Sequence, residues 1–212
     1  FNPEAFGVNP IQHPEDGTVD IEYTVEEKPS DQIELSGGWG GGRVVGTLGI
    51  RFTNFAASKM FKKGTWRPIP TGDGQRVSLR AQSNGLFFQS YNFSFTEPWL
   101  GGKKPNSLSF SVWRSIQSNG QPRLIDGEIN EARTSLQITG AQLGLGQRWK
   151  KPDDWFVFQA SLSYQHFNLD DFGSFFSFSK GRSNNLALTA VVGRNSVSDP
   201  IFPVWGSNVE VS

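Results

Sequence analysis

The sequence of 212 residues contains no cysteine, which excludes disulfide bonds and thiolate metal sites. It has two histidines, His13 and His166, and they lie far apart along the chain. His13 falls in a proline-containing loop and His166 near the end of a predicted strand, so neither indicates a metal site or a catalytic triad. The sequence therefore predicts no catalytic residue, no bound metal and no cofactor.

The chain also lacks an excess of charge of either sign and any long apolar run. Its 20 Lys and Arg residues balance 20 Asp and Glu residues, which gives no electrostatic argument for binding nucleic acid. No apolar segment approaches the roughly 18 residues that a transmembrane helix needs. A membrane β-barrel is still compatible with this composition, because barrel strands place apolar side chains only at alternate positions.

Motifs for nucleotide binding are missing as well. The glycines on either side of Trp39 lack the Lys-Ser/Thr of a phosphate-binding loop and open no predicted helix, so we interpret them as a hairpin. The acidic pairs Asp153-Asp154 and Asp170-Asp171 lie at predicted turns, where backbone hydrogen bonds and solvation explain them. Calcium binding on exposed loops is the alternative for these pairs.

The sequence does contain a period of two along most of its length, which predicts β-strands. One face of each strand is apolar, as with Leu136 and Ile138, and the other is rich in Ser, Gln, Thr and Asn. A soluble β-sandwich would carry more Lys and Glu on its polar face, so the pattern favours a barrel with a polar lumen and an apolar face on lipid. About eight strands are predicted, with a ninth beginning after Gly206: 32–39, 43–56, 76–82, 87–96, 107–115, 134–148, 155–167 and 183–194.

Aromatic residues flank many of the predicted turns. Amphipathic rings at strand ends are typical of the two girdles at the membrane interfaces, and ordinary core aromatics are the alternative. The residues assigned to the girdles are Trp39, Phe55, Phe61, Trp66, Trp99, Trp113, Trp149 and Trp155.

The character of the chain changes near residue 30. Before it, the segment 19–26 alternates apolar residues with Asp, Glu and Thr, which predicts a strand with one face in water. After Pro29, which cannot donate to a strand ladder, glycine becomes frequent and charge becomes rare. We therefore predict a water-soluble segment over 1–29, a barrel over 30–212, and a hinge formed by Glu26, Glu27, Lys28 and Pro29.

These segments resemble one family. VDIEYTVEEKPSDQIELSGGWGGG, followed by GTLGIRFTNF, resembles the junction in BamA-type outer-membrane insertases at which the last periplasmic POTRA domain joins the first barrel strand. FNPEAFGV resembles the end of that POTRA domain. YNFSFTEPWL resembles a barrel strand of the family, and NSVSDPIFPVWGSNVEV resembles the turn before a central strand.

The resemblance implies an all-β antiparallel transmembrane meander: the end of a POTRA domain, then the first eight strands of a sixteen-stranded barrel and the start of the ninth. It makes the sequence a fragment of a longer chain. The implied location is the bacterial outer membrane, with the N-terminal segment in the periplasm. The Val-Arg-Gly-Phe type motif of the family's inward loop is missing from these residues.

The implied function is that of an insertase core subunit, which folds and inserts barrel proteins without nucleotide hydrolysis. The implied partners are unfolded outer-membrane β-barrel clients, accessory assembly lipoproteins and outer-membrane lipid. The alternatives are a two-partner secretion transporter, a TamA-like assembly factor and a passive small porin. A lipid-modifying enzyme on an eight-stranded barrel and a soluble carbohydrate-binding sandwich fit the residues less well.

Within this resemblance, the first predicted barrel strand is the candidate site. An unpaired backbone group in lipid costs several kcal/mol, and an incoming strand satisfies such groups by adding to the sheet. Glycines near the end of the strand weaken its pairing with the closing strand, so that seam opens at lower cost. The alternative is that these glycines fit a tight turn and a crowded lumen. The candidate residues are Gln32, Ile33, Glu34, Leu35, Ser36, Gly37, Gly38 and Trp39.

Overall fold

The computed structural model describes residues 6–13, 15–26, 31–40, 43–66, 69–102, 105–173, 177–199, 201–202 and 204–212. It divides into two compact units, Phe1–Asp31 and Gln32–Ser212. Three of the four predicted hinge residues, Glu27, Lys28 and Pro29, lie outside the described residues. The hinge and the domain boundary after residue 29 stay predictions.

The first unit contains one antiparallel hairpin, β1 (Gly7–His13) and β2 (Thr18–Thr24). The strand predicted around 19–26 is thus present as β2. His13 Nε2 lies 2.9 Å from Asp20 Oδ2 across the hairpin, and both side chains are exposed. This contact gives His13 an ordinary polar partner across the hairpin.

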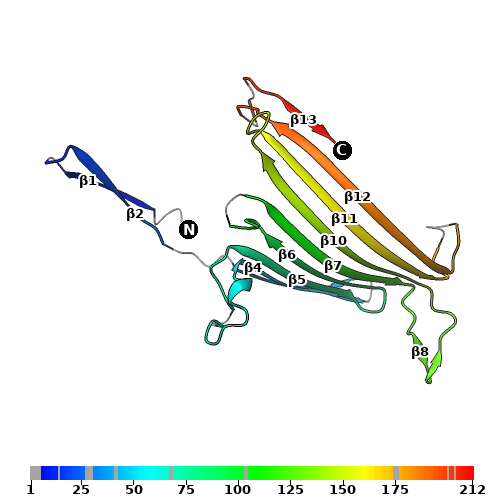
Figure 1. The fold of residues 1–212 in the computed structure, drawn as a ribbon. Coiled ribbons are helices and arrows are strands. Elements are labelled where there is room, and N and C mark those ends of the chain that lie inside the picture. Colours follow the sequence, from blue (N-terminus) through cyan, green and yellow to red (C-terminus); the bar gives the residue numbers. More distant parts are fainter. Residues whose placement is uncertain are drawn as a thin grey trace. The chain divides into compact units, whose positions relative to one another are not determined.

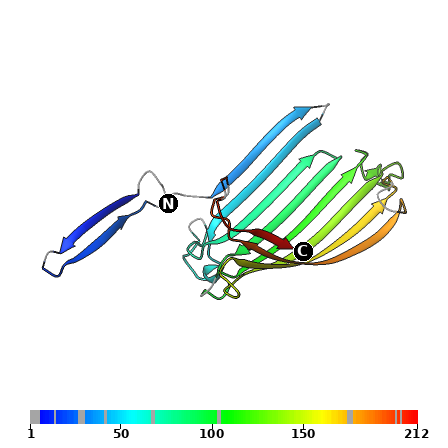
Figure 2. The same cartoon turned by 90° about the horizontal axis from the view of Figure 1, so that it is seen from above.

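The second unit is a single curved sheet of nine strands, in which each strand is antiparallel to its neighbours along the chain (Figures 1 and 2). A short hairpin, β8 (Leu124–Ile125) and β9 (Glu128–Ile129), lies in the connection between the fifth and sixth strands. The nine strands are β3 (Gln32–Gly40), β4 (Arg43–Phe55), β5 (Gln75–Asn84), β6 (Phe88–Glu97), β7 (Ser107–Ser118), β10 (Ser135–Trp149), β11 (Phe156–Asp170), β12 (Gly181–Asn195) and β13 (Asn208–Val211).

The expected all-β antiparallel meander is confirmed, including the start of a ninth strand after Gly206. A single 3-10 turn, η2 (Ala57–Lys59), interrupts the connection between β4 and β5. Within the described residues, no helix is long and apolar enough to cross a membrane. The largest errors in the predicted bounds are at β7 and β11, which extend three residues beyond their predicted ends.

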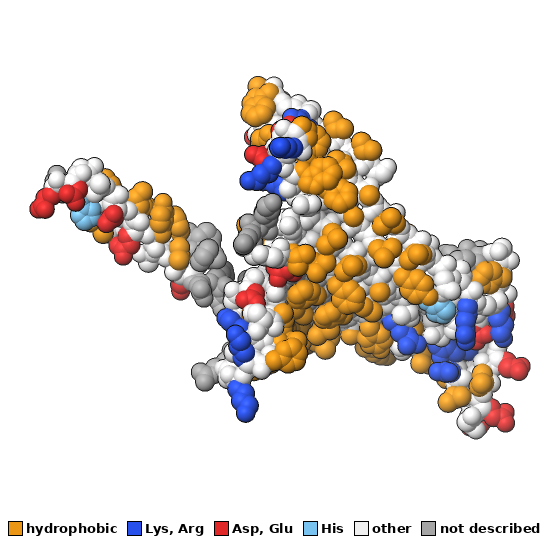
Figure 3. Space-filling view, in the orientation of Figure 1, with side chains coloured by type: hydrophobic (Ala, Val, Ile, Leu, Met, Phe, Trp, Pro, Cys, Tyr) orange, Lys and Arg blue, Asp and Glu red, His pale blue; other side chains and the backbone are white. Residues whose placement is uncertain are grey.

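The sheet places most of its apolar side chains on one face. Directly paired residues such as Leu79, Phe93 and Val112 lie side by side on it, and the rings of Phe93 and Phe110 meet edge to face at 6.4 Å. Figure 3 shows hydrophobic side chains gathered over the sheet. Many of them are exposed, and buried hydrophobic side chains are limited, among the described residues other than proline, to Ala56, Leu136 and Leu169. A soluble domain of this size buries its apolar residues, so this face requires an apolar surrounding.

Two assignments made from the sequence are wrong. Leu136 and Ile138 lie on the polar face, because they pair with Gln117 and Ser115 and are an odd number of residues away from Leu143, which lies on the apolar face. Leu136 is only 5% exposed there. Its neighbour Leu169 is 2% exposed and pairs with Gly181, where an added Cβ would lie 3.3 Å from the Phe178 ring.

Trp113 is the second wrong assignment. It lies inside β7 rather than at a turn, on the same face as Ser109 and Ser111. Its ring covers Gly140 of β10, where an added Cβ would overlap the indole. Trp113 is therefore a packing residue of the polar face, and the absence of a side chain at Gly140 makes room for it.

Candidate functional site

The strand β3 lies at one edge of the sheet, as Figure 2 shows. Its residues from Gln32 to Gly40 pair with Arg51 to Arg43 of β4. Among the described strands, β4 is its only neighbour, so backbone N–H and C=O groups along its other side are left without a strand partner. The eight residues predicted as the candidate site all lie on this one edge.

The apolar side chains of β3 are more exposed than most others on their face. Ile33 is 79% exposed, Leu35 is 82% exposed and Trp39 is 76% exposed. They pair with Ile50, Leu48 and Val44 on one side only, which explains their exposure. A strand added to this edge would cover these side chains and satisfy the free backbone groups together.

On the polar face, one ion pair connects β3 to β5 over the top of β4. Glu34 Oε1 lies 3.2 Å from Arg80 Nη2, and Gly49 of β4 pairs with both residues. A Cβ at Gly49 would lie 3.1 Å from Glu34 Oε2 and 3.3 Å from Glu34 Cβ. The glycine therefore leaves space for the carboxylate to cross the strand. Both charged side chains are about half exposed, so the pair contributes only about 0.2–1 kcal/mol.

The glycines of β3 face open space. Gly37 pairs with Gly46, and Gly38 pairs with Val45. Among the described residues, an added Cβ at Gly38 or Gly46 would meet nothing within 4 Å, and one at Gly37 would make only an ordinary contact at 3.8 Å. Crowding by described residues therefore does not require glycine here. What these glycines do bring is a flexible backbone with no cross-strand side-chain contact, which weakens this end of the β3–β4 pair.

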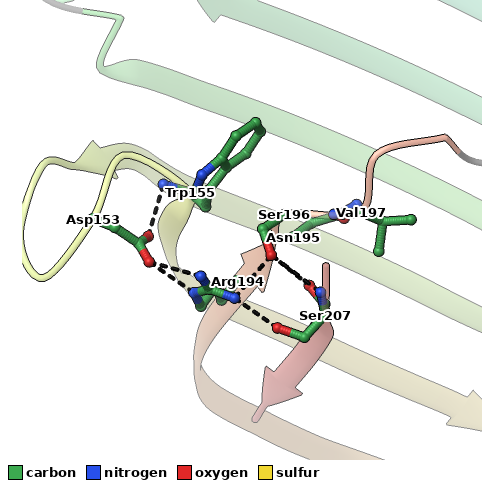
Figure 4. Close-up of polar contacts among 7 residues, drawn as sticks. All are labelled: Asp153, Trp155, Arg194, Asn195, Ser196, Val197 and Ser207. Atoms are coloured by element: carbon green, nitrogen blue, oxygen red, sulfur yellow. Dashed lines mark hydrogen bonds and ion pairs between the residues drawn. The ribbon is translucent and has the colours of Figure 1, made fainter. Parts of the chain in front are cut away.

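A second polar cluster ties two turns together at the end of the sheet where β11 and β13 begin (Figure 4). Asp153 Oδ2 accepts hydrogen bonds from Arg194 Nε at 2.9 Å and Nη2 at 2.8 Å, while Asp153 Oδ1 accepts one from the Trp155 N–H at 3.0 Å. Arg194 Nη1 donates to Ser196 Oγ at 2.9 Å and to Ser207 Oγ at 2.6 Å. Ser196 is buried.

The charge of Asp153 is stabilised by these contacts. Partial burial alone would raise the pKa of its carboxyl group, but the hydrogen bonds from Trp155 and Arg194, with the positive charge of Arg194, lower the pKa below its ordinary value of 3.8. The polar side chains of the cluster hydrogen-bond to one another and so connect the two turns. One indirect signal for this cluster could be read from the sequence, namely the Asn-Ser-Val-Ser-Asp segment quoted for the family resemblance.

The same segment closes the turn before β13 through Asp199. Its Oδ1 accepts hydrogen bonds from the N–H groups of Ile201 at 2.7 Å and Phe202 at 2.9 Å. The hydrogen bond from Phe202 and then the one from Ile201 lower the pKa of Asp199. Ser198 Oγ accepts from the N–H groups of Val204 and Trp205 at 3.2 and 3.3 Å. The motif therefore encodes a turn closed by side-chain oxygens.

Asp170 and His166 make ordinary polar contacts. Asp170 pairs with Lys180 at 3.4 Å, and His166 Nδ1 lies 2.7 Å from Asn184 Oδ1. In the part of the chain that the structure describes, no group of three or more His, Asp and Glu residues is arranged to hold a metal ion.

Comparison with known proteins gives one family. The model of the Omp85 superfamily domain matches residues 71–212, about two thirds of the chain, which include β5 to β13 but not β3. A search of curated proteins finds no match.

Proposed function

Since this chain belongs to the Omp85 superfamily of outer-membrane barrel insertases and transporters, we propose that it is part of an insertase core subunit that templates client strands on β3. The clients are unfolded outer-membrane β-barrel proteins. The N-terminal unit lies in the periplasm in this proposal, and accessory lipoproteins assist. The reaction is strand exchange, and it needs neither a cofactor nor nucleotide hydrolysis.

The observation that carries the proposal is that β3, which has one neighbour among the described strands, also carries glycines that weaken the end of its pairing with β4; β13 shares the one-sided pairing but has no glycine. In lipid, each unsatisfied N–H or C=O group costs several kcal/mol, so such an edge strongly favours any strand that pairs with it. A client strand is the partner whose backbone matches the whole length of the edge. Its energy of pairing, rather than a chemical reaction, drives insertion.

The side chains of β3 also support the addition of a client strand at its free side. Ile33 and Leu35 continue the apolar face of β4, and Gln32, Glu34 and Ser36 continue its polar face. A client strand with a period of two would extend both faces without exposing a polar side chain to lipid. The glycines at the far end of the pairing lower the cost of separating β3 from any strand that closes the barrel.

The proposal is tested by site-specific crosslinking in outer-membrane vesicles that contain the full-length protein and a stalled client. Single photo-reactive residues replace Gln32, Glu34 or Ser36. Matched controls place the same probe at Ser109 and Ser161, on the polar face of strands with neighbours on both sides. We expect crosslinks from β3 to the last strand of the client, in a fixed register, and none from the controls.

Crosslinks only to the protein's own closing strand, with normal client assembly, would contradict the proposal. That result would favour a sealed secretion transporter or a porin. Transport of a soluble substrate with no insertion of a client would favour the two-partner secretion alternative. Client insertion without any β3 crosslink would place templating elsewhere on the barrel.

A further inference from the structure

The apolar face of the sheet ends at a sharp line that runs across β7, β10, β11 and β12. The last apolar row consists of four directly paired residues: Val112, Ala141, Tyr164 and Leu186. The next row on the same face is polar and consists of Arg114, Thr139, His166 and Asn184. In all four strands, moving two residues along the strand changes the side chain on this face from apolar to polar. This line therefore marks one boundary of the hydrocarbon layer.

Tyr164 has the position expected of a residue at such a boundary. Its ring belongs to the apolar row, and its hydroxyl donates a hydrogen bond to Asn184 Oδ1 at 2.9 Å in the polar row. From Phe156 to Tyr164 the apolar face of β11 covers nine residues, or roughly 26 Å along the strand at about 3.3 Å per residue. This length suits a tilted strand that crosses the hydrocarbon core.

Beyond the boundary, the same face carries a groove of about 620 Å³. Five cationic residues line it against a single carboxylate, that of Asp170. Figure 3 shows Lys and Arg side chains gathered at this end of the sheet, beside the hydrophobic surface. The cationic residues are Arg114, Arg123, Arg133, Lys180 and Arg182.

Most of this positive charge is not neutralised. Lys180 forms an ion pair with Asp170 at 3.4 Å, and Asp170 is the only carboxylate that lines the groove. Arg114 donates to the amide oxygen of Gln137 at 3.1 Å, and Arg133 donates to a backbone carbonyl. Within the described ranges, the guanidinium groups of Arg123 and Arg182 have neither a hydrogen-bond acceptor nor an ion-pair partner.

The groove is only partly polar. Leu86, Ile116 and Ile129 also line it, and Ile129 is highly exposed. The groove is lined by residues of the five strands β6, β7, β10, β11 and β12 and of the β8–β9 connection. This connection is closed by hydrogen bonds from Asn130 to the carbonyl groups of Pro122 and Arg123 at 3.0 and 3.1 Å. A ligand that fits this lining combines several negative charges with an apolar part.

We propose that this groove binds the headgroup of an anionic membrane lipid that carries more than one phosphate. Guanidinium groups match phosphate oxygens in charge and in geometry, and two of them are free to do so. The groove adjoins the end of the apolar band, where lipid headgroups lie. The groove is at the end of the sheet opposite to Gln32, so its assignment to the cell surface rests on the proposed periplasmic location of the N-terminal unit.

The test measures binding of a bisphosphorylated diglucosamine lipid to the full-length protein in detergent micelles by native mass spectrometry. In the variant Arg123→Gln/Arg182→Gln we expect the Kd to rise about tenfold, because two charge-assisted contacts are lost. The matched control, Lys62→Gln/Lys63→Gln, removes two exposed charges at the opposite end of the sheet and should change the Kd less than about twofold.

A gain-of-affinity variant protects the test against misfolding. Asp170→Asn removes the only carboxylate of the lining and frees Lys180, so we expect tighter binding, by about threefold, at low salt. Heat-modifiable electrophoretic mobility checks that each variant keeps its folded barrel.

Three outcomes would overturn the inference. One is an unchanged Kd in the arginine variant. Another is equal binding of the dephosphorylated lipid, and the third is full displacement by inorganic phosphate at millimolar concentration, which would make the ligand a free anion. The crosslinks from β3 to a client are measured independently. If lipid binding is intact but no crosslink from β3 to a client forms, the proposed function is refuted and the lipid site is not. If the crosslinks form but the lipid does not bind, only the lipid site is refuted.

Discussion

The edge strand β3 and the mid-sheet strand β11 share the same alternation of apolar and polar residues, yet they differ in their surroundings. β11 has 15 residues and is paired with β10 and β12 on its two sides. β3 has 9 residues and is paired with β4 alone among the described strands. Within the nine-stranded sheet, one-sided pairing is a property that β3 shares with β13, and the glycines near its end set β3 apart.

Proline scanning gives the largest expected contrast between these strands. In β11 every N–H belongs to a ladder, so proline at Ser161, Leu162 or Ser163 should cost about 3 kcal/mol or more. In β3 successive N–H groups point alternately toward β4 and toward the open edge. Proline should therefore destabilise the barrel as much as in β11 only at alternate positions within 33–36. The tolerated positions should instead lose client assembly.

The scan is measured by urea unfolding of the full-length protein in vesicles, together with client assembly. Equal destabilisation at every position of β3 would mean that the edge is permanently paired. Normal client assembly at all tolerated positions would mean that clients do not pair with β3.

Replacing glycine by valine should have opposite effects on stability in a mid-sheet strand and in the edge strand β3. Gly140→Val in mid-sheet β10 would collide with the Trp113 ring, so we expect a loss of about 1–3 kcal/mol. Gly38→Val adds a β-branched residue in open space and should stabilise β3 pairing by up to about 1 kcal/mol. If a weak seam matters, Gly38→Val also slows client assembly, and an unchanged assembly rate would argue against the role of these glycines.

The turn cluster at Asp153 predicts a dependence of stability on pH. Because its pKa is lowered in the folded state, Asp153 stabilises the fold above its ordinary value of 3.8, and this stabilisation is lost as the pH falls through the lower folded pKa. Asp153→Asn should therefore reduce the acid-induced decrease in unfolding midpoint. Asp199→Asn is the comparison, since its carboxyl has a lowered pKa without an arginine partner. An identical acid profile for wild type and Asp153→Asn would contradict the assignment.

The smallest expected effect concerns the ion pair over Gly49. Glu34→Gln and Arg80→Gln should each lower stability by no more than about 1 kcal/mol, because both groups are half exposed. A double-mutant cycle in low and high salt isolates their interaction, which should decrease as salt is added. A coupling that is unaffected by salt would mean that the contact is not electrostatic.

The strands of the nine-stranded sheet could be predicted from the sequence because a period of two is a local property, whereas the short β8–β9 hairpin was not predicted. The errors have a common physical cause. β7, β10 and β11 continue beyond the hydrocarbon boundary, where the apolar and polar faces exchange character at Arg114, Leu136 and Leu169. A prediction that assumes one environment for a whole strand ends the strand at this exchange or assigns the wrong face.

The candidate site could be placed on one strand from the sequence, but the contacts between residues far apart along the chain could not be predicted. The Glu34 and Arg80 pair, and the Asp153 and Arg194 pair, join residues 46 and 41 positions apart. Such pairs depend on strand register, which no local pattern specifies. The groove near Arg182 was missed for the same reason, since its cations come from four separate segments of the chain.

The most direct test of templating at β3 is a disulfide register scan, which the absence of cysteine from these 212 residues makes simple to design. Single cysteines at Ile33, Leu35 and Gly37 of the full-length protein are combined with single cysteines along the last strand of a stalled client. If β3 is the template, moving the cysteine by two residues on β3 moves the preferred client position by two. Disulfides without such a shift, or none to any client position while clients still assemble, would contradict templating by β3.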